Sequence, residues 1–492
     1  MTYCLLRSKT AVAASLLWLL GGCAVGPDFH HPADMKAERY TEKPMPNVMP
    51  QADGISQQLS PETRIPREWW KIFHSPALDA LVRNALNGSP TLDAARATLI
   101  QAREDLASET GYELPQVDLS TTAQRQRFTN AGFGGNAPPN IFNLYNASVK
   151  VSYGIDIFGG LRRQIESQKA QVEYENYQYQ GASLALSANV VTAAVTEASL
   201  RGQIKATKEI IASEEKQVDI VEHQLALGGV AKSDLLLQEG QLAQSRASLP
   251  PLEKSLSQVR HQLAVYVGKT PMDAKLPEIE LDELRLPENL PLSLPSELAR
   301  QRPDIRAADA LLHEASAQVG VATANLYPQI SLSANLGSQS NAFPNLFTGR
   351  TGIWSISGNL LQPIFHGGSL NAKKKSAVAA YDKALAQYRV TVLQSFQNVA
   401  DVLRALESDA ATLNARTDAE SSSREALDLV RKQFGLGAAN YLSLLAAERQ
   451  YQQNRIGVIE ARASRMTDSA ALFQALGGGW WNEDKNGEAS ND

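Results

Sequence analysis

The sequence predicts an α+β membrane protein in which a duplicated repeat supplies four β-strands and very long, coiled-coil-like helices. Three observations predict this fold class. Groups of residues recur after about 210 positions, two very long stretches contain no proline, and shorter stretches alternate apolar and polar side chains. Each repeat is therefore expected to hold a helix, a pair of strands and a long helical hairpin.

The duplication is visible when the chain is compared with itself. One block pairs Pro90, Leu99, Pro115 and Leu119 with Pro303, Leu312, Pro328 and Leu332, at a shift of 213 residues. A second block pairs Val221, Gln224, Leu227, Gly228 and Glu239 with Val430, Gln433, Leu436, Gly437 and Glu448, at a shift of 209 residues. A unit of this length is far longer than a solenoid repeat, so the pattern indicates a duplicated domain.

The predicted organisation places two repeats after an export segment. The expected divisions are a signal peptide at 1–22, a lipidated tether at 23–68, the first repeat at 69–268, a proline-rich connector at 269–296, the second repeat at 297–478 and a C-terminal tail at 479–492.

The N-terminus has the pattern of an export signal. Arg7 and Lys9 precede a short apolar run that rises only about 15 Å as a helix, about half of a bilayer core. Two glycines precede Cys23, as at the lipidation site of bacterial lipoproteins, and Ala24 in place of Asp implies sorting to the outer membrane. We therefore expect lipid on Cys23, the alternative being an ordinary signal with a chance cysteine. Because Cys4 would be removed, the mature chain would form no disulfide.

The long helices are predicted by missing prolines. Residues 161–227 and 370–434 contain none, and each stretch reaches about 100 Å as a helix. Apolar and small residues recur within them at alternating steps of three and four, as in a coiled coil. The seam positions are Gly181, Leu184, Ala188, Val191, Val195, Ala198 and Gly202, and in the second copy Tyr381, Leu385, Tyr388, Val392, Ser395, Val399, Val402 and Leu406. We expect many helices packed side by side, the alternative being two independent bundles.

The strands are predicted by a period of two. Residues 145–157 and 330–336 alternate apolar with polar side chains, which suits a strand with water on one side and lipid or protein core on the other. Their partners at 115–127 and 353–363 are less regular, and the latter is apolar on both faces around Trp354. Turns rich in glycine and asparagine complete the expected hairpins at about 115–157 and 328–364.

Four strands do not close a barrel, and an open edge within a bilayer leaves backbone groups unpaired at several kcal/mol each. No run of eighteen apolar residues follows the signal, so strands would have to cross the membrane. Three chains with twelve strands are the simplest assembly that leaves a lumen. A small water-soluble sandwich is the alternative.

Composition and motifs exclude several classes of function. The net charge is −5 without any basic block, which argues against nucleic acid as a partner. Motifs typical of hydrolases, metalloproteases and nucleotide-binding loops are missing, and the cysteines form no ligand pair. We expect no enzyme, no catalytic or metal-binding residues, and no cofactor apart from the covalent lipid.

The turns of the helical hairpins are candidate functional sites. Leu227 with Gly228 and Leu436 with Gly437 would form the tips. Close to them, Asp219 and Asp428 are equivalent in the two repeats, and Arg431 shares a helix face with Asp428. In an oligomer these charges would form rings that select or bar ions, while a solvated surface ion pair is the alternative.

Several motifs together resemble one family. They are "GCAVGPDF" at 22–29, "WWKIFHSPALDALVRNAL" at 69–86, "GYELPQVDLS" at 111–120, "DIFGG" at 156–160, "PIFHGG" at 363–368, "QFGLGAANYLSLLAAERQ" at 433–450 and "ALGGGW" at 475–480. With these motifs the chain resembles the TolC-like outer membrane factors, specifically their lipidated NodT-type efflux branch.

The resemblance implies a homotrimer in the outer membrane, with a twelve-stranded barrel continued by a periplasmic helical tube. It implies passive efflux of small molecules, with a periplasmic adaptor and an inner-membrane transporter of the RND type as partners. It also implies a periplasmic gate near Asp428, Arg431 and Asp219, and adaptor docking at the hairpin tips. A lipoprotein adaptor or scaffold, and an outer-membrane channel for protein secretion, are the alternatives; the residues do not name a transported substrate.

Overall fold

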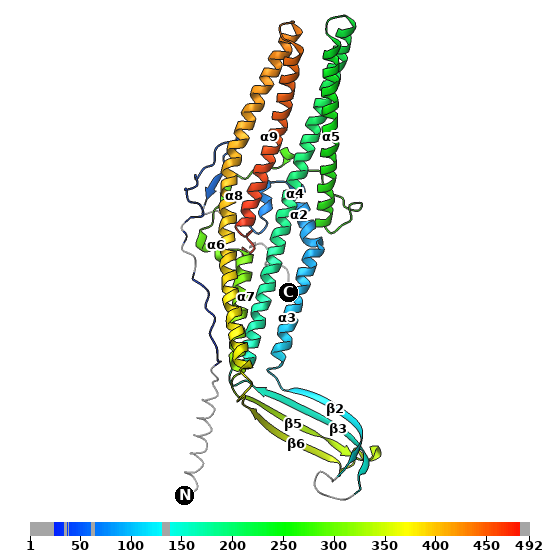
Figure 1. Cartoon of the computed structure of the whole chain (residues 1–492), viewed down its shortest axis with the longest axis vertical. Coiled ribbons are helices and arrows are strands. Elements are labelled where there is room, and N and C mark those ends of the chain that lie inside the picture. Colours follow the sequence, from blue (N-terminus) through cyan, green and yellow to red (C-terminus); the bar gives the residue numbers. More distant parts are fainter. Residues whose placement is uncertain (1–23, 34–36, 38, 61–63, 130–137, 483–492) are drawn as a thin grey trace. The chain divides into compact units, whose positions relative to one another are not determined.

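The computed structural model describes residues 24–33, 37, 39–60, 64–129 and 138–482 (Figure 1). The chain forms two compact units, and each draws on both repeats. The first unit comprises the residues up to Pro32 together with Thr98–Asn176 and Ala307–Arg389. The second comprises Ala33–Ala97, Tyr177–Arg306 and Val390–Asp492. The long helices contribute to both units.

The first unit contains a four-stranded antiparallel sheet. Its strands are β2 (Gln116–Phe128), β3 (Asn140–Ile155), β5 (Gln329–Ser340) and β6 (Gly352–Leu361), in the order β2-β3-β5-β6. Each repeat contributes one hairpin, and β3 joins the two hairpins by pairing with β5. The strand predicted at 145–157 ends at Ile155, because the chain turns there and the amide of Ile157 donates to the carbonyl of Ile155.

The register gives this sheet two different faces. One face is apolar over most of its length and carries Val117, Leu119, Val149, Val151, Leu332, Leu336, Trp354, Ile356 and Leu360. The other is polar and carries Asp118, Ser120, Ser148, Lys150, Ser333, Asn335, Ser355 and Asn359. The expectation that 353–363 is apolar on both faces is therefore wrong. Pairing with β5 sorts Trp354 and Ile356 onto the apolar face, and puts Ser355 on the other.

Helices make up the rest of the two units. They are η1 (Trp69–Phe73), α2 (Pro76–Gly88), α3 (Pro90–Gly111), α4 (Gly160–Ala226), α5 (Lys232–Tyr266), α6 (Pro295–Gln301), α7 (Pro303–Ala324), α8 (Ser369–Gly435) and α9 (Tyr441–Ala475). Helices α4 and α8 are 67 residues each, as the proline-free stretches predict. By length and composition α4 is the one described helix able to cross a membrane, but 61% of its apolar window is buried, as in a protein core.

The second unit has one core shared by both repeats. Val191 and Val195 of α4 belong to the same buried cluster as Val399 and Leu406 of α8. Residues of both predicted seams thus share one buried core, which supports side-by-side helices rather than two independent bundles. Short pieces close this unit: β1 (Gln58–Ser60) pairs in parallel with β4 (Asn289–Pro291), and η3 (Leu281–Glu283) lies in the connector.

The segment after the predicted lipidation site packs on helices of the first unit. The amide of Val25 donates to the carbonyl of Phe158 at 3.0 Å. Arg163 of α4 then bonds the Asp28 carboxylate at 2.7 Å. The Phe29 ring stacks on His313 of α7, with ring centroids 4.3 Å apart. Residues 25–29 are thereby held on the first unit, while Cys23 itself lies outside the described residues.

Candidate functional site

The tips of both helical hairpins are tight glycine turns. Gly228, between α4 and α5, has φ of +74°, and Gly437, between α8 and α9, has φ of +71°. This left-handed conformation is accessible to glycine without strain and ends the preceding helix. Leu227 and Leu436 are 87% and 85% exposed beside these glycines. Figure 1 shows both turns at the same end of the second unit, so each repeat contributes one apolar tip.

The predicted gate residues lie on exposed helix surface near these turns. Asp219 of α4 and Asp428 of α8 are both exposed. Among the described residues no ion pair joins Asp428 to Arg431. The Arg431 guanidinium instead reaches Glu448 of α9, with Nη2 3.3 Å from Oε1. The structure therefore brings Arg431 to the opposite arm of its hairpin and leaves the two aspartates facing solvent in a single chain.

A buried polar layer lies behind this ion pair. Glu448 is 4% exposed and also accepts a hydrogen bond from Nε2 of Gln217 at 2.7 Å. Glu214 is buried beside it and accepts from Gln241 at 3.2 Å and from Gln452 at 3.0 Å. The second carboxylate oxygen of each glutamate has no partner in the described part of the chain. Burial raises the pKa of Glu448, the positive charge of Arg431 opposes that rise, and the negative charge of Glu214 adds to it.

Comparison of the two repeats does not reveal that Glu448 is buried. Its equivalent in the first repeat, Glu239, is exposed, so the same residue type has two different environments. A signal was nevertheless present in the sequence. Tyr441, Leu444 and Leu445 lie on one buried helix face, and Glu448 continues that face at the next turn. A single charged side chain on the apolar face of a helix, such as Glu448, indicates that it has a polar partner in the interior.

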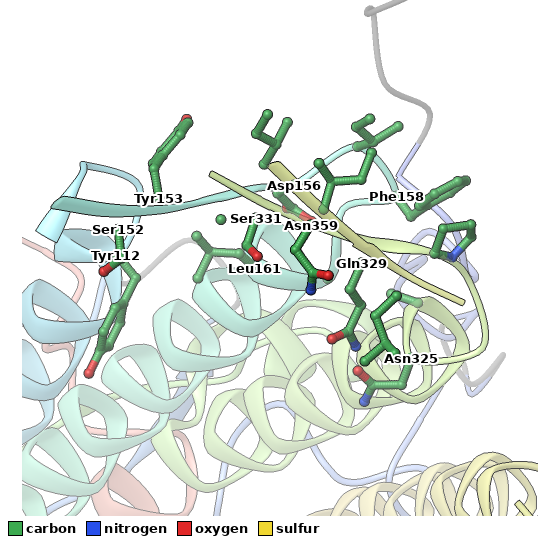
Figure 2. Close-up of a pocket in the computed structure, with 18 of the residues that line it drawn as sticks. Tyr112, Ser152, Tyr153, Asp156, Phe158, Leu161, Asn325, Gln329, Ser331 and Asn359 are labelled. Atoms are coloured by element: carbon green, nitrogen blue, oxygen red, sulfur yellow. The ribbon is translucent and has the colours of Figure 1, made fainter. Parts of the chain in front are cut away.

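A cavity of about 580 Å³ lies in the first unit, where the strand ends meet the helices (Figure 2). Its wall is partly aromatic and partly amide; Figure 2 labels Tyr112, Tyr153, Phe158, Asn325, Gln329 and Asn359 among the lining residues. Asp156 is the one charged residue among the described lining residues, and it accepts a hydrogen bond from the backbone amide of Arg162 at 2.9 Å. Among the described lining residues no nucleophile is paired with a base.

His31 and His313 each contact a carboxylate. Nδ1 of His31 is 2.9 Å from a carboxylate oxygen of Asp309, and Nε2 of His313 is 2.9 Å from Glu166. Partial burial opposes ionisation of Glu166, but hydrogen bonds from Arg163 and His313 outweigh it and hold the pKa of Glu166 below its usual value. The described residues contain no group of three or more His, Cys, Asp or Glu that could hold a metal ion.

A sheet with one apolar and one polar face, joined to long helical hairpins, defines the class of α+β membrane channel subunits. The family is settled by comparison. The model of the outer membrane efflux protein family matches residues 81–269 and 294–478. The chain belongs to the outer membrane efflux protein family.

Relatives and solved structures agree with this family. The pyoverdine export outer membrane protein OpmQ of Pseudomonas aeruginosa is 30% identical over 430 residues, covering 87% of this chain and 90% of its own. The probable outer membrane lipoprotein SilC of Salmonella typhimurium is 26% identical, covering 95% and 98%. The structure of the outer-membrane channel OprN is similar with a TM-score of 0.85 and 27% identity, covering 94% of this chain and all of that one. The predictions of an α+β channel, of outer-membrane location and of an efflux duct are confirmed.

Proposed function

We propose that three copies of this chain form one continuous duct, which passively conducts small molecules out of the periplasm. The observation that carries the proposal is the two-faced sheet. Its edge strands β2 and β6 each have a strand on one side only within the described residues. An unpaired edge in hydrocarbon leaves every second backbone group unsatisfied, at several kcal/mol each. Pairing β2 of one copy with β6 of the next removes all edges at once.

The number of copies follows from the size of the resulting barrel. Two copies would give eight strands, a barrel whose interior is filled by side chains. Three copies give twelve strands, which is wide enough for a wet lumen. The polar face would line that lumen, and Asp118 lies directly opposite Lys150 in the register on that face. Such a lumen is weakly selective and supplies no energy, so direction must come from a partner.

Lipid on Cys23 would anchor the N-terminus in the membrane, in addition to the barrel. Support comes from the signal pattern ahead of Cys23 and from the fixed segment that follows it. A lipoprotein carries more than one acyl chain, which is enough for stable anchoring. No other cofactor is proposed.

The partners would be a periplasmic adaptor and an inner-membrane transporter, of the RND type. The exposed side chains of Leu227 and Leu436 support docking at the tips, because two apolar residues projecting from equivalent turns suit a partner with its own apolar tips. Asp428, with Arg431 and Asp219, would act as the gate of the closed state. Three copies bring like charges together around the axis, which bars ions until the tips move apart.

The first experiment is the native mass of the full-length protein extracted from outer membranes in mild detergent. We expect a trimer that carries acyl groups, and a Cys23→Ala variant that stays trimeric while losing the acyl mass. A monomer would overturn the barrel. For the tips, Leu227→Asp with Leu436→Asp should abolish efflux without changing trimer mass. Met272→Asp, at an equally exposed residue of the connector, is the matched control.

A further inference from the structure

The charged side chains on the apolar face of the four-stranded sheet all lie at the end of β2 near the hairpin turn. The residues of β2 that share this face with Val117 and Leu119 include Arg125 and Arg127, close to the hairpin turn. In the described strands these are the only two charged side chains on that face, since Asp118 and Lys150 lie on the other. The apolar face therefore ends in two arginines at the end of β2 away from the helices.

The length of the apolar face sets the depth of these arginines. From Ile155, where β3 ends near the helices, to Tyr145 the strand runs about 33 Å, or about 25 Å along the membrane normal at a tilt of about 40°. That distance is the height of the lipid-facing band of an outer-membrane barrel. Ala123 pairs with Tyr145, so Arg125 and Arg127 lie just beyond the band.

Aromatic rings mark the same boundary. The ring of Tyr145 makes an edge-on contact with Phe343, at 5.6 Å between centroids. Phe343 is 66% exposed and belongs to η4 (Phe343–Asn345), in the turn of the second hairpin. Aromatic side chains gather where hydrocarbon meets headgroups. From Val151 toward the turn, the order along β2 and β3 on this face is thus apolar, then aromatic at Tyr145, then basic.

The sequence around the two arginines contains no acidic residue. The sequence has no Asp or Glu from Leu119 to Ile155, nor from Gln329 to Leu361. No ion pair joins Arg125 or Arg127 to any described residue. A neighbouring copy would bring β6 beside β2 and would add no acid, because that strand lies within the second acid-free stretch. Both arginines are exposed, and among the described residues neither has an acidic partner.

We propose that Arg125 and Arg127 bind a phosphorylated lipid of the outer leaflet, through the phosphate of its headgroup. Guanidinium donates two parallel hydrogen bonds to phosphate oxygens, which makes arginine the preferred side chain for this group. Two arginines two positions apart on one strand face have Cα atoms about 7 Å apart, so both reach one headgroup. The long side chains keep their stems against the acyl region while the charges stay at headgroup depth.

Lipid binding is measured by native mass spectrometry of the purified full-length protein, titrated with phosphorylated lipid A or with its dephosphorylated form. Wild type should bind the phosphorylated form at least about tenfold more tightly. The double variant Arg125→Gln with Arg127→Gln should lose that preference. Lys150→Gln removes a charge from the opposite face of the same sheet and should keep it. Excess inorganic phosphate should not displace the lipid.

Three outcomes would overturn the proposal: no preference in wild type, an unchanged preference in the double variant, or displacement by free phosphate, which would indicate an anion site. If the double variant assembles poorly, Arg127→Gln alone, at the penultimate residue of β2, provides the same comparison with about half the effect. The measurement does not involve flux, so its failure would leave the channel function and the proposed trimer untouched.

Discussion

Arg431 and Glu448 join the two arms of the second helical hairpin, with 3.3 Å between Nη2 and Oε1. The arginine side chain is 41% exposed and the glutamate side chain 4%. Among the described residues, Arg431 forms no ion pair with Asp428, which lies three residues earlier on the same helix. The Arg431 guanidinium, which solvent still reaches, opposes the rise in the pKa of Glu448 that burial causes, so this member of the proposed gate also has a partner inside the hairpin.

Arg431→Ala should destabilise the hairpin by roughly 1–3 kcal/mol, because it leaves a buried carboxylate without its cation while solvent offsets part of the loss. Hydrogen exchange of α8 and α9 near the turn measures this change. In the Arg431→Ala background, the further change Glu448→Gln should recover most of the protection from hydrogen exchange, because it removes the uncompensated buried charge. Equal exchange in wild type and Arg431→Ala would show that the ion pair contributes nothing.

Asp428→Ala should raise the resting conductance of the channel in planar bilayers, because removing the proposed charge ring lowers the barrier at the closed end. Asp219→Ala should act in the same direction but less. Glu425→Ala, an exposed acid one turn earlier on α8, is the control and should leave conductance at the wild-type level. A conductance that stays unchanged at both low and high salt would remove Asp428 from the gate.

Asp409 of α8 should make the protein less stable as the pH rises. Partial burial, a hydrogen bond to Asp468 and the charge of that residue raise the pKa of Asp409 to about 7, although Arg465 acts in the opposite direction. The folded state therefore binds more protons than the unfolded state between about pH 4 and pH 7, and stability falls across that window. Asp409→Asn should raise Tm by roughly 2–4 °C at pH 8 and by much less at pH 4. A gain of equal size at both values would contradict the protonation argument.

Gly337→Ala should impair formation of the sheet. A Cβ at this position of β5 would lie 2.4 Å from the carbonyl oxygen of Ala147 and 2.6 Å from Cα of Ser148, both backbone atoms of β3. Backbone of a paired strand cannot yield without breaking the ladder, so a penalty of about 1–3 kcal/mol is expected. Gly358→Ala in β6 is the control, because its nearest atom lies at 3.5 Å. The yield of folded protein in isolated outer membranes should fall only for Gly337→Ala.

The sequence predicted the elements well where a single rule acts over many residues. The lack of prolines and the heptad spacing of apolar and small residues predicted both 67-residue helices, and the period of two predicted β3 and β5. The alternation of apolar and polar residues was misleading for β6. Ile353 and Leu361, at its two ends, lie on the same face as the polar residues between them, so that face looks apolar in the sequence. Register with β5 assigns each of its residues to a face, and register depends on the partner strand.

For the candidate sites, the sequence placed the tips correctly, because glycine is needed wherever a long helix reverses. It also determined that both repeats build the same elements, since duplication preserves periodicity. Which charges meet was decided by the tertiary structure alone. Glu239 and Glu448 are equivalent in sequence, yet one is exposed and the other is buried against Arg431 and Gln217. Local patterns fix secondary structure over one or two turns, whereas burial and ion pairing depend on which helix lies opposite, and only packing of the whole chain specifies that.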